Sequence, residues 1–380
     1  MLPVQLTALS LDNFRVYAQA RVEFGSRTTV IVGDNAQGKT SVLEAICALA
    51  RTKSQRTNRD DEMIRWGADQ AIAAGEFQRS ARGPVSLRMV LTSPEAAQFL
   101  GQPAKQLAVN DQPVKGPRDV IGEIAVVVFS PDDLALAKGE PSLRRRFLNV
   151  AIGGIQPAHL SDIQQYTRAM RQRGELLSLV AERQASADQL GSWDRQLARH
   201  GAQVVLARAR YVAQLSEVAG RIHRDLTDGA ETLGIAYRSN VWREGADQAS
   251  ALEGIILEKL EARRAQDLAL RRTMTGPQRD DLALEVGEAD LRKFGSQGQQ
   301  RTAVLAMRLA EAEVARERLG ETPLVLLDDC LSELDEGRAG RVLEQAGDET
   351  QLIITTTHLS EALEGRGDAA VLRVHAGEIG

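Results

Sequence analysis

One short stretch decides the fold of this chain, residues 33–40, which read Gly33-Asp34-Asn35-Ala36-Gln37-Gly38-Lys39-Thr40. The run before it, Thr28-Thr-Val-Ile-Val32, is rich in β-branched residues, as is typical of a strand buried on both faces. The residues after it form a helical pattern with one apolar stripe, made of Val42, Leu43, Ile46 and Leu49. Strand, glycine loop and helix therefore follow one another.

In that context the loop matches G-x-x-x-x-G-K-[ST], the pattern that holds nucleotide phosphates. Backbone N–H groups and the positive end of the following helix supply the binding. We expect ATP here, bound by residues 33–41, that is Gly33, Asp34, Asn35, Ala36, Gln37, Gly38, Lys39, Thr40 and Ser41. Lys39 would contact the β- and γ-phosphates, and Thr40 would offer its hydroxyl to Mg²⁺. The alternative is an ordinary glycine turn.

A second motif is the apolar run Leu324-Val-Leu-Leu, followed by Asp328 and Asp329. Parallel α/β sheets bind ligands at the carboxyl ends of their strands, where these acids would lie. Asp328 is therefore expected to hold Mg²⁺ and Asp329 to act as general base on the attacking water. Strands often end in Asp without such a role. The motif therefore indicates a nucleotide site only in combination with the glycine loop.

Two further candidates each leave an alternative open. His358 follows the run Ile353-Ile-Thr-Thr-Thr, where it would sense the γ-phosphate or serve only a structural purpose. Phe294-Gly-Ser-Gln-Gly-Gln-Gln-Arg301 opens a long helix and suits a second anion site, built from Ser296, Gly298 and Gln299. Such a site would bind the γ-phosphate held by another protomer. The alternative is that Ser296 merely caps a surface helix.

Composition excludes several classes of protein. The chain has 380 residues, 43% hydrophobic and 26% charged, which suits one large domain or two. The sequence contains no apolar run of about 18 residues, so it predicts no membrane span. The N-terminus lacks the features of a secretory signal. Cys47 and Cys330 make neither a disulfide framework nor a zinc pattern. We expect a cytoplasmic protein with no membrane segment.

The net charge of −5 counts mildly against nucleic acid as a partner, but local basic patches decide phosphate contacts. The basic clusters are Arg51/Lys53/Arg56/Arg59, Arg144/Arg145/Arg146, Arg168/Arg171/Arg173, Arg263/Arg264 and Arg271/Arg272. Each is either a DNA contact or a solvated, ion-paired face.

The pattern along the chain predicts an α/β fold with a helical insertion. Residues 1–32 and 68–130 are expected to be mainly strands, with a hairpin turn at Asn110-Asp-Gln-Pro113. Helical spacing extends from about Pro141 to Tyr237 and again over residues 250–272, without the sustained heptads of a long coiled-coil arm. A long helix over residues 299–319 and strands near 323–328, 351–357 and 371–374 complete the chain.

Together these motifs resemble an ABC-type ATPase head of the P-loop NTPase class. Walker A at 33–40, Ser-Gln-Gly-Gln at 296–299, Walker B at 324–329, Ser332-Glu-Leu-Asp335 and His358 occur in the order of that class. Within the class the chain is similar to the RecF family of bacterial DNA replication and repair proteins. Six segments carry this finer likeness: residues 11–15, 53–57, 129–134, 138–148, 275–282 and 295–301.

The resemblance implies an architecture and a function. Residues 1–135 and 273–380 would form the ATPase lobe, and residues 136–272 an inserted, mainly helical second lobe. Two protomers would close on two ATP molecules, so that Ser296, Gly298 and Gln299 of one complete the site of the other. The family implies ATP-dependent binding to gapped, single-stranded and duplex DNA, weak DNA-stimulated ATP hydrolysis, and help with RecA loading alongside RecO and RecR. It also implies roles in the SOS response and in the maintenance of replication forks.

The chain departs from the general pattern in three places. Asp329 stands where most ABC ATPases carry Glu, although Asp is usual in RecF-like proteins. Phe129-Ser-Pro-Asp-Asp133 occupies the expected place of the Q-loop glutamine, and Gln55 stands where an aromatic residue is expected.

Two other functions share the ATPase motifs. One is the energising subunit of a membrane transporter, which the long separation of Lys39 from Ser296 and the arginine-rich insert disfavour. The other is a cohesin-like structural ATPase, which the short insert disfavours.

Overall fold

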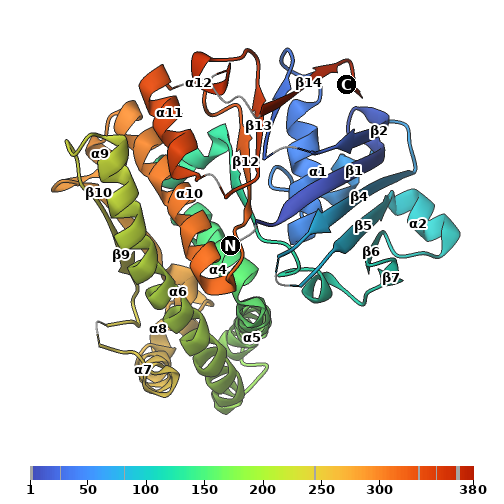
Figure 1. The fold of residues 1–380 in the computed structure, drawn as a ribbon. Helices are drawn as coiled ribbons and strands as arrows, with labels where there is room; N and C mark the ends of the chain where they lie inside the picture. The colour runs from blue at the N-terminus through green and yellow to red at the C-terminus, as the bar shows by residue number, and fades with distance from the viewer. Residues whose placement is uncertain are drawn as a thin grey trace. The chain divides into compact units, whose positions relative to one another are not determined.

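Strand β3 (Thr28–Val32) lies inside a parallel sheet, and all five of its residues are buried. Its neighbours are β13 (Leu352–Thr356) and β14 (Ala369–His375), both parallel to it. The sheet continues through β12 (Leu324–Asp328) to β8 (Val126–Phe129), and β15 (Glu378–Ile379) pairs antiparallel with β14 (Figure 1). Strands from both ends of the chain therefore build one sheet, as the resemblance implies.

This arrangement comes from a computed structural model, which describes residues 3–25, 27–80, 82–243, 245–332, 334–347, 349–364 and 369–380. The chain divides into two compact units, called here unit 1 (Met1–Asp133 with Leu305–Gly380) and unit 2 (Leu134–Val304). No helix among the described residues is both long and apolar enough to cross a lipid bilayer.

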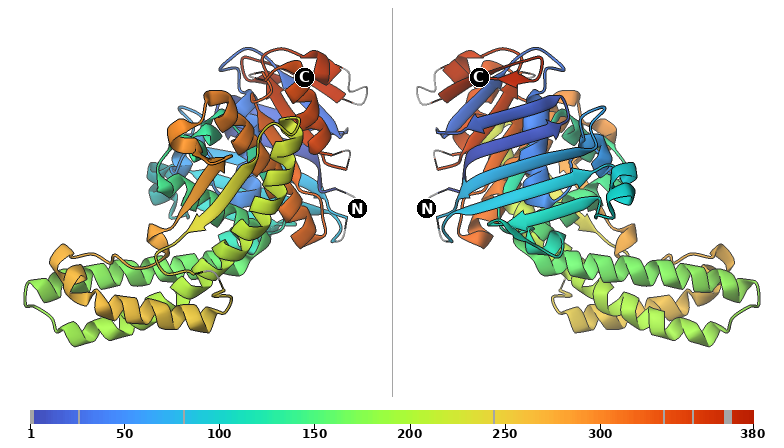
Figure 2. Two further views of the ribbon diagram at one scale, coloured as in Figure 1. Left: turned by 90° about the vertical axis from the view of Figure 1, so that its left-hand side faces the viewer. Right: turned by 90° about the vertical axis from the view of Figure 1, so that its right-hand side faces the viewer.

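Unit 1 holds a second, antiparallel sheet in the order β2-β1-β4-β5-β6-β7. Its strands are β1 (Gln5–Phe14), β2 (Tyr17–Glu23), β4 (Gln70–Gln78), β5 (Val85–Thr92), β6 (Lys105–Val109) and β7 (Gln112–Pro113). The expected hairpin turn is confirmed, because Asn110 and Asp111 have φ values of 50° and 61°, as a type I′ turn requires. The right-hand view of Figure 2 shows this sheet face on.

Helix α1 (Lys39–Arg51) contacts strands of both sheets of unit 1. The sequence predicts one apolar stripe on this helix, but its whole circumference is buried from Ser41 to Ala50. The reason is that β4 and β5 cover one side while β12 and β13 cover another. Even Glu44 has no exposed surface, so its charge must be met by neighbouring side chains.

Unit 2 is mainly helical, as expected. Its long helices are α4 (Pro141–Ile155), α5 (Pro157–Ala181), α6 (Leu190–Leu226) and α7 (Ala249–Ala262), with the shorter α8 (Arg264–Leu270). Helix α6 packs along both α5 and α7, which Figure 2 shows as a layered group of helices. The pairing of α5 with α6 is a short antiparallel hairpin.

Unit 2 also contains a small sheet that the sequence pattern did not predict. The helical spacing was extended to Tyr237, but Leu233–Arg238 is strand β9, paired antiparallel with β10 (Asp281–Val286). Strand β11 (Ala289–Asp290) completes this sheet. Because β10 pairs with β9, residues 273–304 group with unit 2, whereas the sequence placed the second boundary at 272/273.

The remaining elements are short, apart from α10 (Gln297–Leu319), which agrees with the long helix expected there. The short helices are α2 (Pro94–Leu100), α3 (Ala135–Lys138), α9 (Leu291–Phe294), α11 (Glu336–Gln345) and α12 (Glu361–Glu364). Five 3-10 turns lie at Asp60–Met63, Pro117–Asp119, Pro131–Leu134, Ala187–Gln189 and Pro277–Arg279. Both cysteines are free thiols.

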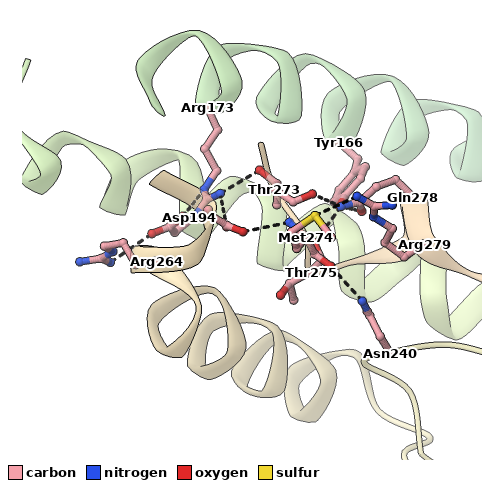
Figure 3. Close-up of polar contacts among 11 residues, drawn as sticks. Tyr166, Arg173, Asp194, Asn240, Arg264, Thr273, Met274, Thr275, Gln278 and Arg279 are labelled. Atoms are coloured by element: carbon pink, nitrogen blue, oxygen red, sulfur yellow. Dashed lines mark hydrogen bonds and ion pairs between the residues drawn. The ribbon is translucent and has the colours of Figure 1, made fainter. Parts of the chain in front are cut away.

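A buried ionic cluster stabilises unit 2. Arg173 on α5 has no exposed surface and donates to Asp194 on α6 at 2.6 Å and to Asp267 on α8 at 2.7 Å. It also donates to Thr273 at 2.8 Å, while Arg264 reaches Asp194 at 3.2 Å (Figure 3). One guanidinium on α5 therefore links α6, α8 and the segment that leads into β10.

Replacing Arg173 by Ala tests the weight of this cluster. Two buried carboxylates would lose their main cation, so we expect the free energy of unfolding to fall by about 3–5 kcal/mol. The matched control is Arg171→Ala on the same helix, where the side chain is 71% exposed and only 3.9 Å from Glu175. This control should change stability by less than about 0.5 kcal/mol. Denaturant unfolding followed by circular dichroism measures both, and equal losses would contradict the cluster's role.

Candidate functional site

The glycine loop begins where β3 ends and is held by the last strands of the chain. A Cβ atom at Gly33 would lie 2.4 Å from the carbonyl oxygen of Val374, so no larger residue fits between the loop and β14. The backbone N–H groups of Ala376 and Gly377 donate to the side-chain and main-chain oxygens of Gln37, at 2.6 Å and 3.3 Å. The β14–β15 turn therefore braces the loop.

Gly38 closes the loop in a backbone conformation that other residues rarely adopt. Its φ is 119°, and a Cβ atom there would lie 2.7 Å from Val16 and 2.9 Å from the Tyr17 hydroxyl. That hydroxyl donates to the Gly38 carbonyl at 3.1 Å, and burial raises the pKa of Tyr17 to about 12. Tyr17 remains a neutral donor that fixes the end of the loop, a role that the sequence analysis missed.

Lys39 lies inside the curve of the loop. Its Nζ donates to the carbonyls of Gly33 and Asp34, at 2.6 Å and 2.9 Å, and the residue is only 6% exposed. Ser41, the last residue of the predicted set, donates its backbone N–H to the Gly38 carbonyl at 2.9 Å and is buried. Asp34, Asn35 and Ala36 form the exposed tip of the loop. The ammonium group is thus positioned at the centre of the predicted phosphate site.

Thr40, at the amino end of α1, meets Asp328, at the carboxyl end of β12. The Thr40 hydroxyl donates to Asp328 Oδ1 at 2.9 Å, and the Thr355 hydroxyl donates to the same oxygen at 2.7 Å. Burial raises the pKa of the Asp328 carboxyl, while the hydrogen bonds from Thr355 and Thr40 oppose that rise. Thr40 and Asp328 are 288 positions apart in the chain, and both are predicted to hold Mg²⁺. The structure brings them into contact.

Asp329 leaves the strand in an unusual conformation. Its φ is 49°, in the left-handed region, and its N–H donates to the Thr355 carbonyl at 3.1 Å. The Ser332 hydroxyl donates to Asp329 Oδ1 at 2.9 Å and to its carbonyl at 2.8 Å. Ser332 therefore orients the predicted general base. Glu333, in the same predicted segment, lies outside the described residues.

His358 follows β13, which lies between β3 and β12 in the sheet. The side chain is exposed, and its Nδ1 lies 3.1 Å from the Thr357 hydroxyl. The Thr356 hydroxyl donates to the His358 carbonyl at 2.8 Å, which fixes the backbone at the strand end. This geometry is compatible with both roles considered for His358.

The Ser296 segment belongs to unit 2 and forms a helix cap. Ser296 N–H donates to Gln299 Oε1 at 2.9 Å, and Gln299 N–H lies 3.2 Å from Ser296 Oγ, which makes a reciprocal capping box. The Gln299 amide also donates to Glu231 at 2.8 Å. Ser296 and Gly298 are exposed, and so is Phe294, at 74%. The capping role is therefore present, on a surface that remains accessible to a partner.

Glu44 organises the segment at residues 53–57. Arg15 donates to its two carboxylate oxygens at 2.8 Å and 2.6 Å, and the Ser54 hydroxyl donates to it as well. Arg56 lies 3.4 Å away, so the buried carboxylate has two cationic neighbours. Gln55 has a buried side-chain amide with no hydrogen-bond partner among the described residues.

The segment Phe129–Asp133, which stands where the Q-loop glutamine is expected, is anchored by Asp133. Asp133 accepts from Ser130 N–H at 2.9 Å and from Arg308 on α10. Arg308 also donates to Glu311 at 2.6 Å. Asp133 therefore ties the end of β8 to α10, all within unit 1.

The similarity of this chain to known proteins covers nearly its whole length. A family model described as RecF/RecN/SMC N terminal domain matches residues 5–377. The DNA replication and repair protein RecF of Geobacillus sp. (strain WCH70) is 36% identical over 377 residues, 98% of each chain. The chain belongs to the RecF family.

Solved structures agree with this assignment to the RecF family. The recombination mediator protein RecF with ATP, from the RecFOR pathway, is 28% identical with a TM-score of 0.90, over 100% of this chain and 98% of that one. An Smc head bound to the C-winged helix domain of ScpA is 15% identical with a TM-score of 0.55, covering 98% and 95% of the two chains. The predicted fold, an ABC-type ATPase head, is confirmed.

The Mg²⁺ that the RecF family fold implies fits the donors present. A hydroxyl and a carboxylate oxygen in contact are hard oxygen ligands, and Mg²⁺ is usually held by one or two such groups together with substrate phosphates and water. No group of three or more His, Cys, Asp or Glu side chains that could hold a metal was found in the described part of the chain. The pair suits a cation that arrives with a nucleotide.

A single glycine substitution tests the packing of the loop in this RecF family member. Gly33→Ala places a methyl group against the Val374 carbonyl, so we expect the free energy of unfolding to fall by about 1–3 kcal/mol. The control is Gly154→Ala in α4, where no atom lies within 4 Å of the added Cβ. That change should be neutral or stabilising by up to about 1 kcal/mol. Thermal unfolding distinguishes them, and a Gly33→Ala protein as stable as the wild type would show that the contact is not tight.

Proposed function

We propose that this chain binds ATP with Mg²⁺ and hydrolyses it slowly as a switch. The observation that carries the proposal is the Thr40–Asp328 contact beside the glycine loop, with Lys39 inside the loop. Lys39 would leave the Gly33 and Asp34 carbonyls for the β- and γ-phosphate oxygens, which are stronger acceptors. The backbone N–H groups of residues 33–41 would bind the remaining phosphate oxygens.

The side chains beyond the loop have distinct roles in this proposal. Thr40 and Asp328 would hold Mg²⁺, which when bound offsets phosphate charge. Asp329 would accept the proton of the attacking water, since Ser332 already holds its carboxylate in one orientation. Its side chain is shorter than the Glu of most ABC ATPases, which suits slow turnover. His358 would contact the γ-phosphate from the end of β13.

We propose further that ATP joins two copies of the chain. Ser296, Gly298 and Gln299 of one protomer would complete the site formed by Lys39, Thr40, Asp328 and Asp329 of the other. The exposure of Ser296 and Gly298 supports this, because a segment with free surface is available to a second copy. Hydrolysis would then remove the phosphate that bridges the two copies and let them separate.

The biological task follows from the RecF family. The relatives include DNA replication and repair proteins and a recombination mediator of the RecFOR pathway. We therefore propose ATP-dependent binding to DNA at single-strand gaps and duplex junctions, stimulation of hydrolysis by DNA, and cooperation with RecO and RecR in loading RecA. These would serve gap repair, the SOS response and stalled forks. Such work on chromosomal DNA places the chain in the cytoplasm.

Two substitutions test the composite site. Lys39→Arg puts a larger group where Nζ lies within 3 Å of two carbonyls, and Ser296→Arg obstructs the surface offered to the partner. Each should abolish ATP-induced dimerisation, measured by light scattering with and without ATP. A mixture of the two variants should restore at most one working site per dimer.

The wild type provides the comparison. It should dimerise with ATP, and gapped DNA at low salt should accelerate its hydrolysis of ATP. If either variant still dimerises with ATP, the shared site is wrong. If DNA has no effect and the protein associates with membranes instead, the DNA function is wrong.

A third substitution separates binding from hydrolysis. Asp329→Asn keeps the size of the side chain but removes the base, so turnover should fall by about 10²–10⁴-fold while ATP-induced dimerisation remains. Phosphate release and light scattering measure the two effects. The matched control is Asp335→Asn, where the carboxylate caps α11 by accepting from the Arg338 N–H at 2.9 Å. Equal losses of turnover in both variants would contradict the assignment of Asp329.

A further inference from the structure

The arginines of unit 2 differ sharply in whether a carboxylate meets them. Arg144 on α4 is 3% exposed and binds both oxygens of Asp281, at 2.7 Å and 2.9 Å. Arg208 on α6 is 4% exposed and donates to Asp280 at 2.9 Å and to the Pro277 carbonyl at 2.8 Å. These two arginines are internal, and they engage the two adjacent carboxylates of the 275–282 segment.

Two more arginines lie near the same carboxylates, and neither forms an ion pair with any residue that the structure describes. Arg145 is half-buried, and its guanidinium donates to the Asp280 main-chain carbonyl at 2.8 Å. Arg279 is exposed, and its guanidinium donates to the Met274 sulfur at 2.9 Å, which is a weak acceptor (Figure 3). Four arginines thus lie near Asp280 and Asp281, and the contacts to the two carboxylates come from Arg144 and Arg208.

This arrangement leaves positive charge in excess. Burial lowers the pKa of Arg145, and the positive charges of Arg208 and Arg279 lower it further, although Asp280 and Asp281 act in the opposite direction. Arg279 follows directly on Asp280 in space and precedes it in the chain, Arg145 donates to the Asp280 carbonyl, and like charges near one another repel unless an anion lies between them. A group with several anionic oxygens would relieve the repulsion and accept from both guanidinium groups.

The backbone that carries Arg279 is held rigidly. Gly276 has a φ of 122° and donates its N–H to Asn240 at 3.2 Å. The Gln278 amide donates to the carbonyls of Thr273 and Thr275 at 3.2 Å and 3.0 Å, and Tyr166 donates to Gln278 (Figure 3). Arg279 ends this fixed turn, so its backbone is in place before any ligand arrives and only its side chain has to be ordered on binding.

We propose that Arg145 and Arg279 form a phosphate-binding site that takes a backbone phosphate of DNA. The inference rests on the proposed DNA-binding function and assigns it to particular side chains. It also separates these two from other basic residues of the sequence: Arg51, Arg59 and Arg173 each have a carboxylate within 4 Å. A guanidinium already paired to a carboxylate gains less from a phosphate than one without such a partner.

The test measures binding of a fluorescently labelled gapped duplex by anisotropy, over a range of salt concentrations. Arg145→Ala and Arg279→Ala should each weaken binding roughly fivefold to tenfold at 0.1 M salt, whatever the sequence of the duplex. Each should also reduce the slope of log affinity against log salt by about one. The control Arg171→Ala removes an exposed arginine that has a carboxylate partner, and it should leave affinity and slope unchanged.

Conservative substitutions guard against loss of structure. Arg279→Lys keeps the charge on an exposed side chain and should retain most of the affinity and the full salt slope. Arg279→Glu should bind more weakly than Arg279→Ala. Circular dichroism should give all Arg279 variants the same unfolding transition, because this side chain is exposed and donates to a weak acceptor, the Met274 sulfur.

The outcomes separate the site from the function. If the wild type binds DNA and the Arg145 and Arg279 variants bind equally well with the same slope, the site is wrong while the proposed function stands. If the wild type itself does not bind DNA at low salt, the proposed function fails and the site with it. If the variants bind DNA normally but no longer dimerise with ATP, the anion is a nucleotide phosphate of a second copy and the DNA assignment is overturned.

Discussion

The structure of unit 1 depends on one oxygen atom, Asp328 Oδ1, which accepts from Thr40 and Thr355. These three residues end β12, begin α1 and end β13, so their hydrogen bonds join three separate parts of the chain at one edge of the sheet. Because the carboxylate is buried, losing either donor would leave it short of partners. The same contacts bring together the hydroxyl and the carboxylate that are proposed to hold Mg²⁺.

The sequence alone predicted the parts of the site that depend on local geometry. A glycine loop between a β-branched run and a helix has few alternatives, since Gly33 and Gly38 are required by close approach and positive φ. Thr355, Tyr17 and Ala376 were missed because their roles arise from contacts between distant segments. Thr355 stood in a run of three threonines at a strand end, which was the only available signal. The spacing of residues 233–238 resembled a helix, and only pairing with β10 makes them a strand.

The roles of the arginines also depended partly on local sequence and partly on tertiary contacts. The sequence could group arginines, but not say which of them find carboxylates. In the structure the family-specific segment at 275–282 is largely buried, with Asp280 at 0% exposure, so much of its role is to hold unit 2 together. Its one exposed cation, Arg279, extends from that rigid base. Structural and binding roles therefore coexist in a single short motif.

The position of β3 in its sheet has a consequence for how the chain is made. Both of its partners, β13 and β14, come from the last part of the chain, so the N-terminal part offers β3 no strand to pair with. At roughly 5–20 residues per second, a ribosome reaches β13 on the order of tens of seconds after it has made β3. During that time a strand that is fully buried in the finished fold, and the glycine loop that follows it, lack the neighbouring strands of their sheet. The phosphate loop of the growing chain therefore gains the strands and the turn that brace it only at the end of synthesis.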